Sequence, residues 1–300
     1  AHNPPDTFVF VAALYKMVGK RFVFDHHDLS PEMYLARFNG RGNPFIYKAL
    51  IWAEKLSCRM ADLVIATNGS YKGVEMERGK IPEQRIRIVR NGPDKKISQY
   101  ESDPRQRQCG KIMIGYFGVM GHQDGVDYLL RALHHLIYNL GRTDFCCVLV
   151  GDGDACDGLK ALVEQLELSA HTQFVGWVQL SELPSYIASV DICVAPEPSN
   201  SYNDRSTMIK MMEYMALGKP IVAFDLPEHR YSAQDAARYV EPNNELKFAQ
   251  AIAELMNDPE RRQRMGEFGR KRVEAELTWD YSVPNLLNAY RSLSQSAQEV

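Results

Sequence analysis

The order of apolar segments is the feature that most constrains how this chain can fold. Eight short apolar runs occur, and most are continuous rather than alternating, as expected for strands buried on both faces. They cover residues 21–28, 62–67, 85–92, 111–118, 145–153, 171–178, 191–197 and 220–225. Amphipathic stretches lie between most of them, at residues 7–18, 45–60, 124–140, 156–168, 181–189 and 206–217. This alternation predicts an α/β fold whose βαβ units build parallel sheets.

The polar segment 92–110 has no apolar period and predicts a linker between two domains. We expect a first domain with its linker at residues 1–105, a second domain at 106–278, and a terminal helix that returns to the first domain at 279–300. The opening residues, AHNPPD, read as the turn after a strand that is not present. At roughly 30 residues per strand–helix unit, about 80 to 100 residues of the first domain would precede them.

The composition, with 45% hydrophobic and 24% charged residues, is that of a soluble globular protein. A net charge of −3 gives no bulk attraction to nucleic acid, and no nucleic-acid partner is expected. The apolar run before Lys16 is too short to span a bilayer, and no secretory signal is evident, so we expect a cytoplasmic protein. The cysteines at 58, 109, 146, 147, 156 and 193 contain no Cys-x-x-Cys pair and predict buried free thiols.

The stretch NDRSTMIKMMEYMALGKPIVAF, residues 203–224, places one cation and one anion on an otherwise apolar helix. Ser206 or Thr207 can cap this helix, whose free N–H groups and dipole would attract phosphate. Lys210 would add a full charge, and Glu213 could accept two hydrogen bonds from a ribose diol. The alternative is an ion pair between Lys210 and Glu213 on a solvated face, although the apolar neighbours leave little such face.

Several long motifs resemble family 4 retaining glycosyltransferases. MEYMALGKPIVAFDLPE is similar to that family's nucleotide-sugar motif, and IGYFGVMGHQDGVDYLLRAL to the first strand, turn and helix of its donor domain. VRNGPD is similar to the domain junction, LVGDGDACDGLKALVEQLEL with FVGWV to the middle of the donor domain, and TWDYSVPNLLNAYRSL to the terminal helix. The resemblance covers most of the chain. It implies a GT-B fold, in which two Rossmann-like parallel-sheet domains face a cleft, with the first domain incomplete here.

The resemblance also implies donor-binding positions. The backbone at Gly118 and Gly121 would approach the pyrophosphate closely, and the backbone at Gly176 and Trp177 would meet the base. The start of the helix, from Ser206 through Thr207 to Met208, would hold phosphate.

This sequence departs from the family pattern at the cations and at one acid. The family usually has a second glutamate eight positions before Glu213, where this chain has Arg205. It often has an arginine and a lysine at the positions of Val119 and Asp124. We therefore expect Lys210, with Arg205, to supply the charge that the phosphates require.

The segment FDHHDLSPE places His26, His27 and Asp28 just after a buried strand. The resemblance implies that His27 is the active-site histidine, and a histidine there can position a hydroxyl or share its proton. A histidine that caps the next helix is the structural alternative. A metal site formed by His26, His27 and Asp28 is a weaker interpretation, because adjacent ligands on an extended chain diverge.

Two other segments have alternative interpretations. Asp152-Gly153-Asp154 imitates an Asp-x-Asp metal motif, but it lies between a strand and a helix and predicts a structural turn. We therefore expect no metal, no cofactor, and activity that survives a chelator. Residues 31–60 combine cations with aromatic residues, which suits either an anionic membrane surface or an ordinary helix with snorkelling side chains.

Taken together, the sequence predicts a glycosyltransferase that moves a sugar from a nucleoside diphosphate sugar to an acceptor hydroxyl with retention. The resemblance implies a role in bacterial polysaccharide or glycolipid synthesis, with His27, Lys210 and Glu213 as the central residues. Alanine at Lys210 or Glu213 is expected to abolish most transfer without unfolding the protein. The alternatives are an epimerase or hydrolase of the same fold, or a sugar-nucleotide-binding protein without turnover.

Overall fold

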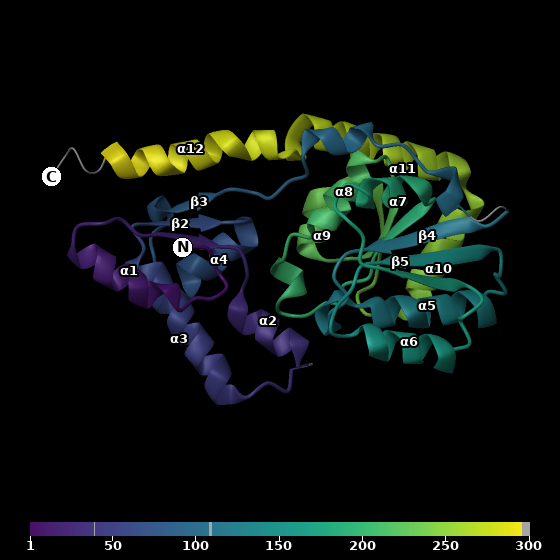
Figure 1. Ribbon diagram of the computed structural model, residues 1–300, viewed down its shortest axis with the longest axis horizontal. Coiled ribbons are helices and arrows are strands. Elements are labelled where there is room, and N and C mark those ends of the chain that lie inside the picture. The colour runs from purple at the N-terminus through teal and green to yellow at the C-terminus, as the bar shows by residue number, and fades with distance from the viewer. Residues whose placement is uncertain (39, 108–109, 296–300) are drawn as a thin grey trace. The chain divides into compact units, whose positions relative to one another are not determined.

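The computed structural model describes residues 1–38, 40–107 and 110–295 (Figure 1). These residues form two units. The first contains residues 1–92, 205–207 and the chain from residue 279 onward; the second contains residues 93–204 and 208–278. The boundaries expected from sequence lay at 105/106 and 278/279. The segment expected as a linker contains two short 3₁₀ turns, Lys95–Gln99 and Pro104–Gln106.

The first unit is built on a three-stranded parallel sheet. Its order is β1-β2-β3, with bounds Val23–His26, Leu63–Ala66 and Ile86–Ile88. The helices of this unit are α1 (Phe8–Met17), α2 (Ser30–Arg37), α3 (Pro44–Met60), α4 (Gly69–Glu77) and α12 (Trp279–Gln295). The last helix packs against β2 and β3, although it is separated from them by nearly the whole second unit in sequence (Figure 1).

The second unit contains a six-stranded parallel sheet of order β6-β5-β4-β7-β8-β9. Its strands are β4 (Ile112–Phe117), β5 (Phe145–Val150), β6 (Thr172–Gly176), β7 (Ile192–Ala195), β8 (Ile221–Phe224) and β9 (Ala237–Val240). In chain order within the unit this is 3-2-1-4-5-6, the doubly wound Rossmann arrangement. The order reverses between β4 and β7, and ligands of such sheets bind beyond the carboxyl ends of the strands at this point.

Helices cover both faces of the larger sheet, which explains why its central strands are continuous apolar runs. Strands β5, β7 and β8 are buried along their whole length. Helices α5 (Val126–Tyr138), α6 (Cys156–Gln165) and α10 (Glu245–Asn257) pack in one core cluster. Helices α7 (Leu183–Ser189) and α8 (Ile209–Ala216) pack in the other. The remaining helices of the unit are α9 (Pro227–Ala233) and α11 (Pro259–Arg272).

Each of the eight predicted strands corresponds to a strand of the structure. The sequence analysis missed β9 and the helices α2, α4, α9, α10 and α11. Strand β9 lies at the sheet edge with only its last residue buried. Helix α11, PERRQRMGEFGRKR, is polar on nearly every face, so it carries little of the apolar periodicity that reveals a helix.

The cysteines at 58, 146, 147, 156 and 193 are buried free thiols, as predicted. Cys109 lies outside the described residues. Among the described helices, none combines the length and the apolar character that crossing a bilayer requires.

Candidate functional site

The carboxyl ends of β4 and β7 bring together a set of charged and aromatic side chains in the second unit. Tyr116 lies near the end of β4, and Glu197 follows β7 by two residues. Lys210 reaches them from the first turn of α8. Its Nζ lies 2.7 Å from Glu197 Oε1 and 3.9 Å from Asp124 Oδ1, and it donates a hydrogen bond of 2.9 Å to the Tyr116 hydroxyl. The cluster therefore lies where the strand order reverses, which is the expected ligand position.

Lys210 carries its charge in a largely buried place. Its ammonium lies 4.4 Å from the centre of the Tyr116 ring, in a cation–π arrangement. Burial by itself lowers the pKa of Lys210, but the carboxylate of Glu197, with Tyr116 and Asp124, raises it well above the usual value. Burial raises the pKa of Tyr116 as well, so the hydroxyl stays neutral. The site thus holds a permanent cation at neutral pH.

The ion pair that the sequence left open does not form between Lys210 and Glu213. Among the described residues, the ion-pair partners of the Lys210 ammonium are Glu197 and Asp124. Asp124, where the family often has a lysine, therefore binds a cation instead of supplying one. Sequence reasoning missed Glu197 and Tyr116. Their positions could have indicated them, because both lie at the carboxyl ends of strands that were correctly predicted.

A glycine turn lies beside the ammonium. Gly118 has a φ of +143°, and a Cβ at this position would lie 3.5 Å from Lys210 Nζ. The Gly121 amide donates a hydrogen bond of 3.0 Å to Asp124 Oδ2. Val119, between the glycines, is exposed. The structure therefore brings the predicted Gly118 turn and Lys210 together, and the backbone there can approach a ligand closely.

Glu213 lies one turn further along α8 and lines a pocket of about 290 Å³. The lining also includes the apolar residues Leu180, Leu183 and Pro184, while Asp94 and Lys96 supply polar groups. Burial raises the pKa of Glu213, and the charge of Lys210 partly offsets this. A carboxylate at the border of a mostly apolar hollow is suited to bind the hydroxyls of a ligand whose flat part packs on the aliphatic side chains.

Gly176 and Trp177 stand at the end of β6. Gly176 has a φ of +85° and its carbonyl accepts a hydrogen bond of 2.9 Å from the Gly151 amide. The Trp177 side chain is 72% exposed. Their backbone therefore lies at the same edge of the sheet as the cluster around Lys210. Contact of this backbone with a nucleotide base stays a prediction.

The predicted capping of the phosphate helix by Ser206 or Thr207 is wrong. Helix α8 begins at Ile209, and its N-cap is Met208, which makes no side-chain cap hydrogen bond. Ser206 and Thr207 instead bind side chains of the first unit. Tyr71 Oη and Ser206 Oγ lie 3.1 Å apart, and Thr207 Oγ1 accepts hydrogen bonds from Asn68 and Arg90 of 3.0 and 3.1 Å.

Arg205 belongs to the same anchored segment, because its carbonyl accepts a hydrogen bond of 2.8 Å from Asn68 Nδ2. The capping prediction was wrong because a hydroxyl near a helix start bonds to whichever polar group packs closest. Here those groups are side chains from distant parts of the sequence and not the amides of α8.

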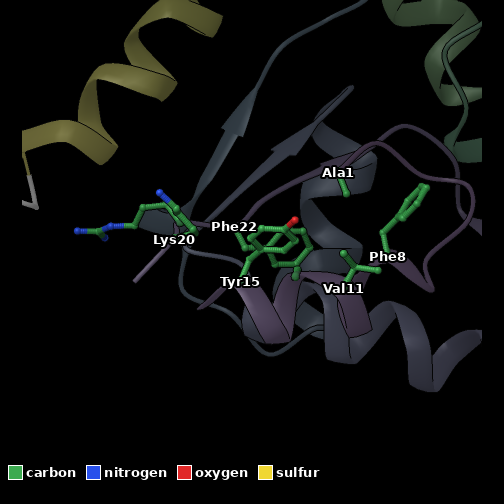
Figure 2. Close-up of a pocket in the computed structure, with 8 residues that line it drawn as sticks. Ala1, Phe8, Val11, Tyr15, Lys20 and Phe22 are labelled. Atoms are coloured by element: carbon green, nitrogen blue, oxygen red, sulfur yellow. The ribbon is translucent and has the colours of Figure 1, made fainter. Parts of the chain in front are cut away.

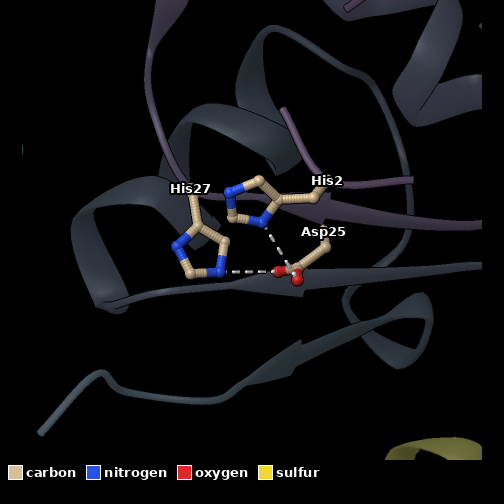
Figure 3. Close-up of side chains that lie close together, drawn as sticks. All are labelled: His2, Asp25 and His27. Atoms are coloured by element: carbon tan, nitrogen blue, oxygen red, sulfur yellow. Dashed lines mark hydrogen bonds and ion pairs between the residues drawn. The ribbon is translucent and has the colours of Figure 1, made fainter. Parts of the chain in front are cut away.

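In the first unit, His27 follows β1 and is joined by two residues that sequence reasoning did not connect to it. His27 Nε2 lies 3.1 Å from Asp25 Oδ1, and His2 Nδ1 lies 3.4 Å from Asp25 Oδ2 (Figure 3). The rings of His2 and His27 are 4.1 Å apart. Burial raises the pKa of Asp25, but the interactions of this carboxylate with His27 and His2 outweigh burial and hold the pKa below its usual value.

The grouping of His26, His27 and Asp28 as one site is wrong. His26 is the last residue of β1, and its completely buried ring lies 3.1 Å from Glu75 Oε1 and 3.7 Å from Glu54 Oε2. Successive residues of a strand point to opposite faces, so Asp25 and His27 share one face while His26 enters the core. The capping alternative for His27 also fails, because Leu29 is the N-cap of α2.

Asp152-Gly153-Asp154 forms the predicted turn between β5 and α6. Asp152 Oδ1 accepts a hydrogen bond of 2.8 Å from the Gly153 amide. A Cβ at Gly153 would lie 2.5 Å from the Met120 carbonyl oxygen, so this glycine allows the turn to pack against the Gly118–Gly121 loop. The context of this motif is therefore that of a βα turn.

A second hollow, of about 310 Å³, lies beside α1 in the first unit and is mainly apolar (Figure 2). Phe8, Val11 and Tyr15 of α1 line it together with Phe22.

On α3, Phe45 and Trp52 are exposed near Lys48. These three residues of the segment expected to form a basic and aromatic surface are thus exposed.

The two parallel-sheet units and the cluster at the strand-order reversal define a GT-B fold. A sequence profile described as glycosyl transferases group 1 matches residues 99–272, which is more than half of the chain. The chain belongs to this glycosyltransferase family.

Curated proteins with similar sequences are also glycosyltransferases. An uncharacterized glycosyltransferase of Methanocaldococcus jannaschii is 26% identical over 81% of this chain and 63% of its own length. The alpha-D-kanosaminyltransferase of Streptomyces kanamyceticus is 23% identical over the same two shares. This chain thus spans 63% of the length of these two relatives.

Among solved structures, Anabaena HepE in complex with UDP-glucose superposes with a TM-score of 0.77 at 19% identity, covering 97% of this chain and 77% of HepE. WaaG, a glycosyltransferase involved in lipopolysaccharide biosynthesis, superposes with a TM-score of 0.69 at 14% identity, covering 89% of this chain and 73% of WaaG. These likenesses concern the fold.

Proposed function

We propose that the protein transfers a sugar from a nucleoside diphosphate sugar to an acceptor hydroxyl, with retention of the anomeric configuration. The observation that carries this proposal is the charged Lys210 ammonium beside the Gly118 turn, where the strand order of the second unit reverses. A pyrophosphate held by the backbone of this turn would lie within reach of the ammonium. As the leaving group departs, its growing negative charge would be stabilised by a cation that is already in place.

Glu213 completes the donor site in this proposal. The nucleoside would occupy the pocket of about 290 Å³, with its ribose hydroxyls on the Glu213 carboxylate and its base toward the backbone of Gly176 and Trp177. Arg205 would add a second cation for the phosphates, and His27 would contact a hydroxyl of the reacting sugars. The complexes of HepE with UDP and UDP-glucose support a nucleotide sugar as donor class.

Donor binding should weaken in acid because of Glu213. Burial raises the pKa of Glu213, so the carboxylate becomes protonated at a higher pH than an exposed glutamate would. The protonated form loses acceptor capacity, and affinity for the matching nucleotide sugar should fall as the pH drops through this raised pKa. A hydrogen bond to a charged group contributes about 1.5–3 kcal/mol, so its loss corresponds to about 10- to 150-fold in Kd.

The measurement begins with a thermal-shift screen of UDP-, GDP- and ADP-sugars, followed by titration calorimetry of the best ligand between pH 8 and pH 5. The matched control is Glu213→Gln, which should bind weakly with little dependence on pH. Equal pH dependence in the wild type and in Glu213→Gln would remove Glu213 from the donor site. Failure of every sugar nucleotide to bind would remove the proposed function itself.

We further propose that the transfer requires no metal ion or other cofactor. The lysine cation replaces the divalent ion that other enzymes use to neutralise a pyrophosphate. Release of nucleoside diphosphate should therefore not slow after dialysis against EDTA. A loss of turnover in EDTA that Mn²⁺ restores would show that this part of the proposal is wrong.

The acceptor in this proposal is a growing cell-surface polysaccharide or a glycolipid, and the protein works at the inner face of the membrane. The putative teichuronic acid biosynthesis glycosyltransferase TuaH of Bacillus subtilis, 25% identical over 83% of this chain, is one relative that supports this class of acceptor. The exposed Phe45 and Trp52 of α3, near Lys48, offer a surface suited to anionic headgroups.

A further inference from the structure

Three possible metal ligands meet on one face of the first unit. His2, Asp25 and His27 each offer one ligand atom, and these atoms all lie within 4.8 Å of one another (Figure 3). We propose that this triad binds a divalent transition-metal ion of the zinc type. The triad belongs to the first unit, whereas the cluster around Lys210 belongs to the second.

The distances between the ligand atoms fit a small ion. Bonds of zinc to histidine nitrogen and carboxylate oxygen are close to 2 Å, so neighbouring ligands of a tetrahedral ion lie about 3.3 Å apart. The observed separations are 3.1 Å between His27 Nε2 and Asp25 Oδ1 and 3.4 Å between His2 Nδ1 and Asp25 Oδ2. The ligand atoms of His2 and His27 lie within 4.8 Å of each other as well, so adjustment of the side chains can bring all three residues to one ion.

Asp25 has an oxygen that lacks a hydrogen bond. Its Oδ1 is buried and accepts no hydrogen bond among the described residues, although it lies near His27 Nε2. A buried carboxylate oxygen without a hydrogen bond is costly. An ion between the imidazole nitrogen and this oxygen would satisfy both atoms.

The backbone holds the triad in place before any ion binds. The Asp25 amide donates to the Ala1 carbonyl at 2.7 Å, and the Asn3 amide donates to the Asp25 carbonyl at 3.0 Å, so His2 and Asp25 occupy paired positions of adjacent parallel segments. The His27 amide donates to Asn3 Oδ1 at 2.6 Å. These bonds limit the ordering that metal binding would otherwise require.

Asn91 can set the tautomer of His27. The Asn91 side-chain amide lies 3.4 Å from His27 Nδ1. The atom facing the ring is the amide nitrogen; after a flip of the amide, the oxygen would accept a hydrogen bond from Nδ1–H and leave the Nε2 lone pair for the metal. Metal-binding histidines are commonly oriented by such a second hydrogen bond.

The ligand set indicates which ions would bind. Imidazole suits zinc, cobalt and nickel, whereas magnesium and calcium prefer oxygen ligands. Two histidines and one carboxylate also leave a position for water or for another ligand. Because the proposed transfer uses His27, a bound zinc ion would inhibit it; this consequence rests on the proposed function, whereas the binding itself does not.

The test measures zinc binding directly. The full chain, freed of metal with a chelator, should bind one Zn²⁺ in competition with a chromophoric chelator, and Co²⁺ should give visible absorption bands in the range of low-coordinate nitrogen and oxygen sites. His2→Gln, Asp25→Asn and His27→Gln should each weaken Zn²⁺ binding by at least about 100-fold, since even outer-shell changes cost 10- to 100-fold. Millimolar Mg²⁺ should not compete.

His135→Gln is the matched control, since it removes a histidine from α5 in the second unit and should leave Zn²⁺ affinity unchanged. Circular dichroism of each variant establishes that it is folded. The proposal is overturned when the three triad variants bind Zn²⁺ as tightly as the wild type does, or when the wild type shows neither competition nor cobalt bands. Neither result depends on whether the protein transfers sugars.

Discussion

Replacing Lys210 with methionine is expected to lower the turnover of sugar transfer by about 10²- to 10³-fold, the loss typical when one preorganised group that stabilises transition-state charge is removed. Methionine fills a similar volume but carries no charge. The ammonium lies beside the Gly118 turn, where the leaving pyrophosphate would gain charge. The measurement is the initial rate of nucleoside diphosphate release at saturating donor, followed with a coupled phosphatase.

The same change should also destabilise the fold, which sequence reasoning did not anticipate. Glu197 is completely buried, and its closest cation is Lys210 at 2.7 Å. Breaking a buried ion pair by removing one partner costs about 3–5 kcal/mol, because the other charge stays buried without compensation. Denaturant unfolding of the Lys210→Met variant should show this cost.

A double variant separates the two effects. Adding Glu197→Gln to Lys210→Met removes the uncompensated carboxylate, so much of the lost stability should return while turnover stays low. If the double variant transfers sugar at the wild-type rate, the positive charge is not needed for the chemistry. If it is no more stable than Lys210→Met, the buried carboxylate is not the source of the cost.

Replacing His27 with glutamine is expected to lower turnover by about 10²- to 10⁴-fold, the range for a lost acid–base group. The His27 side chain is 26% exposed, and its Nε2 lies 3.1 Å from Asp25 Oδ1, so the carboxylate can orient the ring near the surface of the first unit. Stability should change little, because the ring is not part of the core. Rates are compared in buffer containing EDTA, which removes any effect of bound zinc.

His135→Gln again serves as the control for His27, because it makes the same substitution on a helix outside the proposed machinery. Asp25→Asn adds a graded comparison, since it keeps the His27 ring but weakens its orientation. Turnover of His27→Gln within a factor of about three of the wild type would rule out an acid–base role.

Much of the fold could be predicted from the sequence because burial on both faces leaves a local signal. The continuous apolar runs of β5, β7 and β8 identified central parallel strands without reference to any neighbour. Helix α11 and strand β9 could not be predicted in this way. Strand β9 is held by pairing with β8 and helix α11 by packing on α8, and neither carries a clear periodic pattern of its own.

The candidate site was predicted less completely. Lys210 and Glu213 were predicted from their spacing on one helix, and Gly118 from the family resemblance; the roles of all three stay predictions. Glu197 was missed because an acidic residue after a strand does not by itself indicate a site; its role depends on the cation that it binds, Lys210. The hydroxyls of Ser206 and Thr207 were assigned to the nearest helix, whereas side chains more than a hundred residues away bind them.

By itself, the sequence determined that parallel sheets form, which apolar runs become their strands, and that one otherwise apolar helix carries Lys210 and Glu213. These properties depend on residues that are close along the chain. Only the tertiary structure decided that Lys210 binds Glu197 instead of Glu213, and that His27 shares its face with Asp25 and His2 while His26 enters the core. The physical reason is that charges and hydrogen bonds are satisfied by whichever groups the packed strands bring within about 3 Å, wherever these lie in sequence.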